Sequence, residues 1–300
     1  MAAELEPTLP GASFYEVGEE VGVWRDTWRR LTRNKLAVAS MVIIGILIVT
    51  GFVSIFWTPY QVWQEGLGPT YQGPTLRHPL GLDDLGRDML SRLMGGALIT
   101  LEVGLGTALL SSIIGIALGL LAGFYRGAVD AVITLIINVW YGIPDLLVVI
   151  MFVVVTQQRS LTFIIVAIAL TAWLGMARLV RGQTLALRET EFIEAARSIG
   201  TRDWSLLVRH ILPNAIGPII VQGTFQIPAA ILFEAFLSFL GQGVPPPTPS
   251  WGAMASEGYA ALQIAPHLVL VPAIALSVTL LAFNFLGDGL RDALDPRMRK

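Results

Sequence analysis

The residues that could take part in chemistry are few in this sequence. It contains no cysteine, which excludes disulfides, thiolate nucleophiles and cysteine-bound zinc. Its two lysines, Lys35 and Lys300, do not follow a glycine-rich loop, so a P-loop for ATP is excluded. The sequence also has no His-Glu-x-x-His pair and no Gly-x-Ser-x-Gly elbow. We therefore expect no catalytic residue, no metal site and no cofactor on this chain.

Three acidic residues fall inside apolar segments and are candidates for a pathway or a gate: Glu102, Asp145 and Glu234. Ionisable groups at membrane depth are costly, and they mark functional sites by default. Glu234 lies deepest in its apolar run, although a structural hydrogen bond to a neighbouring helix fits it equally well. Glu102 is close enough to the end of its segment to reach water. Asp145 follows Pro144, where it could cap the helix that resumes there.

The elements that carry these residues are membrane-spanning helices. Hydrophobic residues make up 54% of the 300 residues and charged residues 14%, against about 25% in soluble proteins. The mean hydropathy is +0.66. A net charge of −2 provides no basic field for a nucleic acid. Six segments are long enough to cross about 30 Å of hydrocarbon, which predicts an all-α polytopic membrane protein: 36–57, 98–124, 131–155, 161–180, 215–240 and 268–287.

Basic residues indicate the orientation of these spans. With both ends of the chain inside, sixteen of the 20 lysines and arginines face the cytoplasm, as the positive-inside rule favours. The expected organisation is a cytoplasmic tail, a first span, an outer loop, a five-helix core with an inner and an outer loop, and a second tail. The corresponding ranges are 1–35, 36–57, 58–97, 98–287 (with loops 181–214 and 241–267) and 288–300.

Two further expectations concern the spans themselves. Pro144 should kink or interrupt the third span. The second span carries small residues every three or four positions, which predicts a face where another helix approaches closely. These residues are Gly104, Ala108, Ser112, Gly115, Gly119 and Gly123. Trp251, which follows a run of three prolines, is expected at the membrane interface.

The inner loop 181–214 predicts two short helices bent at Gly200, which suits a left-handed position after a helix end. Phe192, Ala195, Ala196 and Ile199 share one apolar face, which must be buried on a membrane surface or on another protein. Thr201 is expected to cap the second helix, and Pro213 to disrupt it.

Several motifs resemble those of one transporter family. Glu194-Ala195-Ala196, Gly200 and Ile211-Leu212-Pro213 match the EAA loop of permease subunits of ABC importers. Segments 78–97, 236–254 and 283–297 are similar to the C-type permeases of dipeptide and oligopeptide importers, a branch that includes nickel and glutathione permeases. The chain departs from the family pattern at Leu82, Ala97 and Asp145.

The resemblance implies a type I importer fold in the inner membrane of a prokaryote, surrounded by lipid. The helix from Glu194 to Gly200 would dock into a separate ATPase subunit, which holds ATP and Mg²⁺. The further partners would be a homologous second permease, an extracytoplasmic substrate-binding protein and a peptide substrate. The charged residues of the first outer loop would either contact the binding protein or form a solvated surface: Asp83, Asp84, Arg87 and Asp88. A rival hypothesis is a stand-alone proton-coupled carrier that relays protons through the three acidic candidates.

Overall fold

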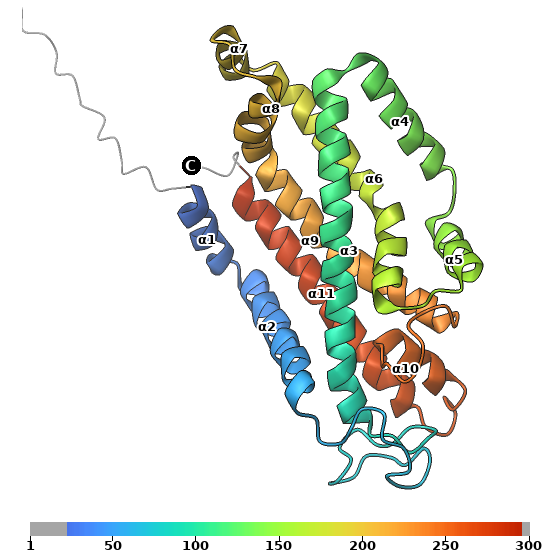
Figure 1. Ribbon diagram of the computed structural model, residues 1–300. Coiled ribbons are helices and arrows are strands. Elements are labelled where there is room, and N and C mark those ends of the chain that lie inside the picture. Colours follow the sequence, from blue (N-terminus) through green and yellow to red (C-terminus); the bar gives the residue numbers. More distant parts are fainter. Residues whose placement is uncertain (1–22, 296–300) are drawn as a thin grey trace, which may run out of the picture.

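The computed structural model describes residues 23–295, and within this range the chain is built from helices joined by loops (Figure 1). The tail segments 1–22 and 296–300, which include Arg297, Arg299 and Lys300, lie outside the described residues. The elements are α1 (Val23–Arg33), α2 (Lys35–Phe56), α3 (Met89–Tyr125), α4 (Gly127–Tyr141), α5 (Asp145–Thr156), α6 (Leu161–Arg188), α7 (Glu191–Ser198), α8 (Asp203–Ser205), the π-helical turn η1 (Leu206–Ile211), α9 (Leu212–Phe239), α10 (Trp251–Tyr259) and α11 (His267–Leu294).

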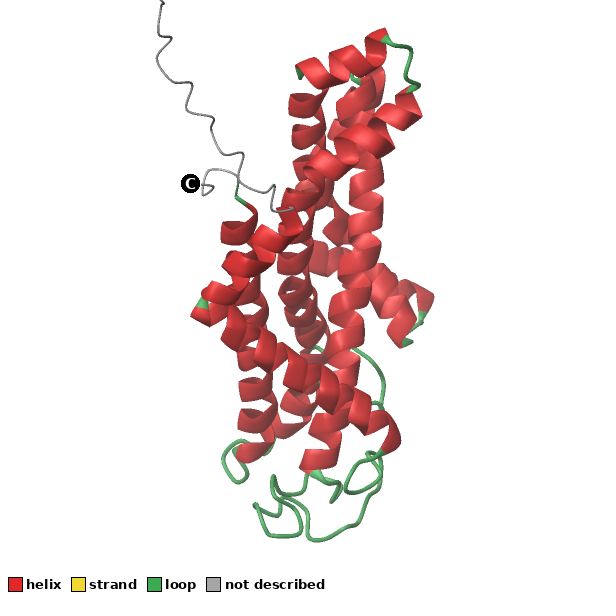
Figure 2. Cartoon of the chain, turned by 90° about the vertical axis from the view of Figure 1, so that its left-hand side faces the viewer, coloured by secondary structure: helices red, strands yellow, loops and turns green. Residues whose placement is uncertain are grey.

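The long helices run side by side along the molecule, and the longest loop gathers at the end opposite α7 and α8 (Figure 2). Five described helices are long and apolar enough to cross a membrane: α2, α3, α6, the continuous helix Asp203–Phe239, and α11. A sixth span arises if α4 and α5 count together, although they are bent by 87° at the break between them. The predicted interruption at Pro144 is therefore confirmed, because proline lacks the N–H that would continue the helix and constrains the residue before it.

Several helices extend beyond the apolar segments from which they were predicted. Helix α3 begins at Met89 rather than near 98, because the Asp88 carboxylate caps it by accepting a hydrogen bond from the Ser91 N–H. Helix α6 continues to Arg188 and α11 to Leu294. Hydropathy detects only the part of a helix that is compatible with lipid, so parts of the predicted loops 58–97 and 181–214 and of the tail 288–300 are helical.

The predicted small-residue face of α3 is confirmed, and its partner is mainly α6. A Cβ added at Gly119 would lie 2.6 Å from the Ala177 carbonyl oxygen, and one at Gly123 would lie 2.8 Å from the Arg181 carbonyl oxygen. Gly104, nearer the start of α3, instead makes room for the side chain of Ile231 of α9. The backbones of α3 and α6 thus meet at distances that no larger residue allows. Helices in a bilayer associate in this way because lipid leaves no hydrophobic force between them.

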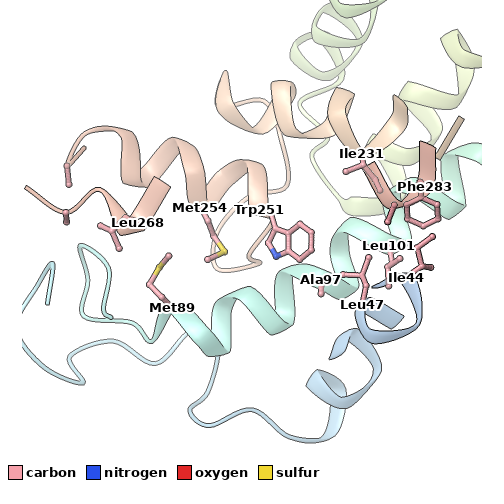
Figure 3. Packing of buried hydrophobic residues seen from close by; sticks show 13 residues of the cluster. Ile44, Leu47, Met89, Ala97, Leu101, Ile231, Trp251, Met254, Leu268 and Phe283 are labelled. Carbon is pink, nitrogen blue, oxygen red and sulfur yellow. The ribbon is translucent and has the colours of Figure 1, made fainter. Parts of the chain in front are cut away.

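At the opposite end from α7, a buried cluster joins α2, α3, α9, α10 and α11 (Figure 3). Trp251 lies at its centre between α10 and α3, with 3% of its surface exposed, and its Nε1 donates a hydrogen bond to the Leu93 carbonyl. The expectation of an interfacial indole was wrong. Gly96, which would clash with the indole if it carried a Cβ, allows the ring to be enclosed by the chain.

The α3–α6 contact can be tested with Gly119→Ala. The new methyl group meets a backbone oxygen that cannot move away, so we expect the free energy of unfolding to fall by about 1–3 kcal/mol. Gly45→Ala in α2, where a Cβ meets nothing within 4 Å, is the matched control and should not destabilise the protein. Thermal unfolding in detergent measures both, and equal melting temperatures would contradict the proposed packing.

Candidate functional site

Helix α7 stands at the end of the helix bundle opposite the long loop 57–88 (Figure 1) and is held there by its own apolar side. Ile193 and Ala196 are buried. They pack into a cluster with Leu206, Leu207 and Ile211 of η1 and with residues of α3 and α6: Leu120, Phe124, Met176 and Val180. Ile193 was missed in the sequence, and Ala196 was assigned to the opposite face. Ile193 and Ala196 are three residues apart, which is a helical spacing, and two adjacent leucines, Leu206 and Leu207, follow in the same loop. Together these features could have identified the buried side of α7.

The remaining apolar side chains of this region face outward. Ile199 is 84% exposed, Trp204 73% and Phe192 44%, and Ala195 is exposed beside them. We call Phe192, Ala195, Ile199 and Trp204 the exposed loop face. Phe192, Ala195 and Ile199 recur every three or four residues and so share one side of α7. A surface with this many large apolar groups in so small an area is typical of an interaction site.

Glu194 lies beside the exposed loop face, and its carboxylate makes no hydrogen bond or ion pair with any described residue. Glu191 and Glu194 are in the first turn of α7 and Arg197 is in the last, an order that the helix dipole favours. Glu194 is therefore a free acidic group next to an apolar surface.

Gly200 ends α7 as predicted. Its φ of +84° is left-handed, and the Thr201 N–H donates to the Ala196 carbonyl at 3.1 Å, which closes the helix end. Thr201 does not cap the next helix, because the N-cap position belongs to Arg202, whose side chain makes no capping hydrogen bond.

The expectation that Pro213 disrupts the second helix was wrong. The missing N–H of Pro213 is accommodated by η1, in which the Leu212 N–H donates to the Leu207 carbonyl, one residue further back than in an α-helix. As a result Asp203–Phe239 forms a single long helix. Of the three motif residues, Ile211 is buried in the α7 cluster, Leu212 is half-buried, and Pro213 is exposed. The loop is thus joined to the spanning helix α9 without a flexible break.

A second connection runs from α7 to α3 through Phe124, which the sequence gave no reason to select. The guanidinium groups of Arg188 and Arg197 lie 5.6 and 5.8 Å from the centre of its ring. Arg188 also donates a hydrogen bond to the Phe124 carbonyl, and Arg126 pairs with Glu189 nearby. The end of α3 is therefore held both by the end of α6, through Arg188, and by the end of α7, through Arg197.

A groove of about 980 Å³ lies beside this region, between α6, α9, the end of α11 and Trp24. Its polar lining includes the amide side chains of Gln183, Asn214 and Gln222 and the guanidinium of Arg291. The rest of the lining is largely apolar. Groups that both donate and accept hydrogen bonds are thus spread along an apolar wall.

The three acidic candidates do not form one site. Glu234 is 1% exposed and accepts a hydrogen bond from the Ser238 Oγ at 2.5 Å. Ser238 in turn accepts from Ser250, the N-cap of α10, at 3.2 Å. Glu234 therefore ties α9 to α10. Glu102 and Asp145 are exposed, and Asp145 is the first residue of α5, where it makes no capping hydrogen bond.

Gln226 is a polar residue of the spanning region that the sequence did not single out. Its Oε1 accepts from Ser112 at 3.0 Å and from Ser111 at 3.3 Å, while its Nε2 donates to the Ala172 carbonyl at 3.1 Å. One side chain of α9 thereby joins α3 and α6, and the absence of competing water favours such bonds within the bilayer.

The charged segment that precedes α3 is enclosed rather than solvated. Arg92 Nη1 donates to Asp83 at 2.5 Å and to Glu257 at 2.8 Å, and Arg87 reaches the same two carboxylates. Burial alone would lower the pKa of Arg87, but the charges of Asp83, Glu257 and Asp84 raise it above its ordinary value. The carboxylates of Asp83, Asp84 and Glu257 lie close together, and the guanidinium of Arg87 donates a hydrogen bond to each of them.

The expected solvated surface is therefore wrong for Asp83, Arg87 and Asp88, which are at most 5% exposed. Asp88 accepts hydrogen bonds from the Ser91 backbone and lies 2.9 Å from the Nδ1 of His78. Of the four residues, only Asp84 keeps a carboxylate with substantial exposure, at 38% of its side chain, and it remains a candidate contact for a binding protein.

Long apolar helices, a long loop fixed by buried ion pairs and a loop helix with an exposed apolar face at the opposite end are the features of an integral membrane protein with an interaction surface. Residues 115–300 match the family described as binding-protein-dependent transport system inner membrane component. Residues 22–74 match the N-terminal transmembrane domain of oligopeptide transport permease C. The chain belongs to this family of ABC importer permeases, which are inner membrane components and not themselves enzymes.

Three relatives agree over most of the chain. It is 42% identical to a glutathione transport system permease protein of Pectobacterium atrosepticum, with 92% of each chain covered. It is 43% identical to a dipeptide transport system permease protein of Bacillus subtilis, covering 92% of this chain and 86% of the relative. Identity to an oligopeptide transport system permease protein of the same organism is 40%, covering 94% and 92%.

Solved structures support the fold. An inward-facing structure of the MetNI methionine ABC transporter has a chain that aligns with a TM-score of 0.57 at 21% identity. The alignment covers 69% of this chain and 98% of that one. The permease fold predicted from the sequence is confirmed.

The outer ion network should be structural. Arg92→Met leaves the buried Asp83 with one fewer cation, so we expect the free energy of unfolding to fall by about 3–5 kcal/mol. Arg77→Met, in an exposed part of the same loop, is the matched control and should have little effect. Thermal unfolding in detergent measures both. An unchanged melting temperature for Arg92→Met would mean that the network contributes nothing to stability.

Proposed function

We propose that this chain is the permease subunit of an ATP-driven importer for short peptides and forms half of its translocation pathway. The names of its relatives, which specify dipeptides, oligopeptides and glutathione, favour a peptide. Glutathione, itself a small peptide, is the second candidate. Nickel is disfavoured because imidazole and thiolate are the usual ligands for such metals, and the chain has three histidines and no cysteine.

The observation that carries the proposal is the exposed loop face of α7, a helix whose buried side packs on the start of the spanning helix Asp203–Phe239. A separate ATPase subunit would cover Phe192, Ala195 and Ile199, and Glu194 would meet polar or basic groups at the edge. Ala195, which is small, lets the partner approach closely. ATP and Mg²⁺ would be bound by that partner.

Coupling then follows from two connections. In the first, the buried side of α7 packs against α3 and α6. In the second, α8, η1 and α9 form one continuous helix that is long and apolar enough to span the membrane. A displacement of α7 would therefore move α9 directly. ATP binding to the partner would favour one of two helix packings, and the pathway would open to alternate sides as that balance shifts.

The groove beside α9 is the part of the described surface that best suits a peptide. Gln183, Asn214 and Gln222 can each donate to a peptide carbonyl and accept from a peptide N–H. The apolar remainder tolerates different side chains. A homologous second permease would supply the facing wall, and an extracytoplasmic binding protein would deliver the peptide to the outer end near Asp84. Glu102 and Asp145, exposed on α3 and α5, stay candidates for that facing surface, whereas Glu234 serves as a structural tie to α10.

The energy source is the first test. In proteoliposomes containing the whole transporter, we expect peptide uptake to require ATP hydrolysis and to survive collapse of the proton gradient. Uptake by this chain alone after a pH step would instead support the proton-coupled carrier, and would exclude an ATP-driven importer.

The exposed loop face is the second test. Ile199→Asp places a charge where the partner would bury an apolar group, so we expect stimulated ATPase activity and uptake to fall about tenfold or more, by analogy with interface anchors. The chain should fold normally, because Ile199 is 84% exposed. Ile264→Asp, 73% exposed near the start of α11, is the matched control.

Two further variants test the same loop. Glu194→Ala and Gly200→Pro should leave membrane insertion intact but weaken ATPase docking or its coupling to transport, the second because proline cannot adopt a φ of +84°. Normal uptake by all three loop variants would remove the role assigned to α7.

A further inference from the structure

Helix α1 is an amphipathic helix whose outward side has no partner among the described residues. Thr27 and Leu31 are buried, and Leu31 packs with Ala37 and Ala293 against the end of α11. Gly289 of α11 permits this contact, because a Cβ there would meet Ala37 at 2.6 Å. One side of α1 is thus fixed to the helix bundle, and the other side is free.

The free side carries two parallel stripes. Trp24 and Trp28, one helical turn apart, are 59% and 60% exposed. Next to them run Arg25, Arg29 and Arg33, spaced by four residues each and all exposed. Asp26, the acidic residue of α1, is already paired with Arg30 at 2.6 Å.

No described carboxylate pairs with Arg25, Arg29 or Arg33, and their guanidinium groups make no hydrogen bond with described residues. Lys35 follows at once and is also exposed. On one flank of α1, Arg29, Arg30 and Arg33 line a groove of about 490 Å³ whose opposite wall is Gly289, Asp292 and Ala293 of α11. The surface therefore carries a local excess of positive charge beside a recess.

The position of α1 relative to the membrane identifies the partner. Only Asn34 separates α1 from α2, whose 22 residues span about 33 Å at 1.5 Å per residue, close to the thickness of the hydrocarbon core. The first residues of α2, and with them Arg33 and the adjoining end of α1, therefore lie at the level of the lipid headgroups, and the rest of α1 continues away from α2 (Figure 1). Indole rings prefer this zone, and arginines there bind anionic lipids.

We propose that α1 is an interfacial anchor that binds anionic phospholipid of the inner leaflet. The phosphates contact the Arg25, Arg29 and Arg33 stripe, and Trp28 lies beside the headgroups, whereas Trp24, one turn further along α1, borders the groove beside α9. The proposal rests on the cytoplasmic orientation of α1 that the basic residues predict, and it is independent of the transported substrate. Bound lipid would stabilise the packing of α1 against α11. The end of α11 in turn borders the groove that is proposed to bind the peptide.

The test uses the full transporter, delipidated in detergent and titrated with phosphatidylglycerol or phosphatidylcholine, with bound lipids counted by native mass spectrometry. Wild type should prefer phosphatidylglycerol. Each arginine near an anionic surface strengthens binding by about fivefold, so R25Q/R29Q/R33Q should weaken it by up to about a hundredfold. R25K/R29K/R33K keeps the charges and should bind within about fivefold of wild type. Arg77→Gln, on the outer loop, is the matched control and should bind like wild type.

The site of contact is read from Thr32→Cys, because the chain has no cysteine and Thr32 is exposed, its hydroxyl bonding only to backbone carbonyls of α1. A photoreactive label there should crosslink to lipid. Crosslinking to an ATPase or to the second permease would overturn the proposal. Equal phosphatidylglycerol affinity for wild type and R25Q/R29Q/R33Q, in assemblies with the same melting temperature, would also overturn it.

Discussion

The close approach of α3 and α6 is the constraint on which the rest of this molecule depends. The two backbones come together at Gly115, Gly119 and Gly123, where a Cβ would meet carbonyl oxygens or side-chain carbons at less than 3 Å. In a bilayer there is no hydrophobic force between helices, so such contacts provide the packing energy. The inner ends of the same helices supply Leu120, Phe124, Met176 and Val180, which form the seat of α7. The exposed loop face is thus built on a pair of helices that pack backbone against backbone.

The link between the loop and the membrane depends on a local departure from regular helix geometry. A proline at position 213 would be expected to separate a loop helix from a spanning helix. The π turn η1 shifts the hydrogen-bond ladder by one residue and keeps the helix continuous, while it points Leu206, Leu207 and Ile211 toward α7. Turns of this kind are frequent at functional sites. Here η1 keeps the helix continuous across Pro213, a position that could otherwise be a hinge, and so connects α8 directly to α9.

The two ends of the protein use their charges in opposite ways. At the end that carries the loop 57–88, arginines and carboxylates are buried against one another, which gives the loop a fixed shape and fastens it to α10 through Glu257. At the end that carries α7, Arg25, Arg29 and Arg33 of α1 and the carboxylate of Glu194 are left unpaired within the described chain. Buried pairs specify the chain's own fold, whereas exposed unpaired charges beside apolar groups suit contacts with lipid or protein.

The sequence alone determined the membrane class, the approximate spans, the small-residue face of α3, the break at Pro144 and the left-handed Gly200. Each depends on local properties, namely apolar length, residue size and backbone conformation, that a neighbouring helix does not change. Only the tertiary structure decided which side of α7 is buried, because Ile193 and Phe192 are equally apolar and their fates depend on where η1 lies. For the same reason it alone could show that Glu234 is a tie to α10, that Asp83 and Arg87 are enclosed, and that Trp251 is in the core. A charge or an indole acquires its role from residues far away in the sequence, such as Glu257 and Leu93, and only the folded chain brings them together.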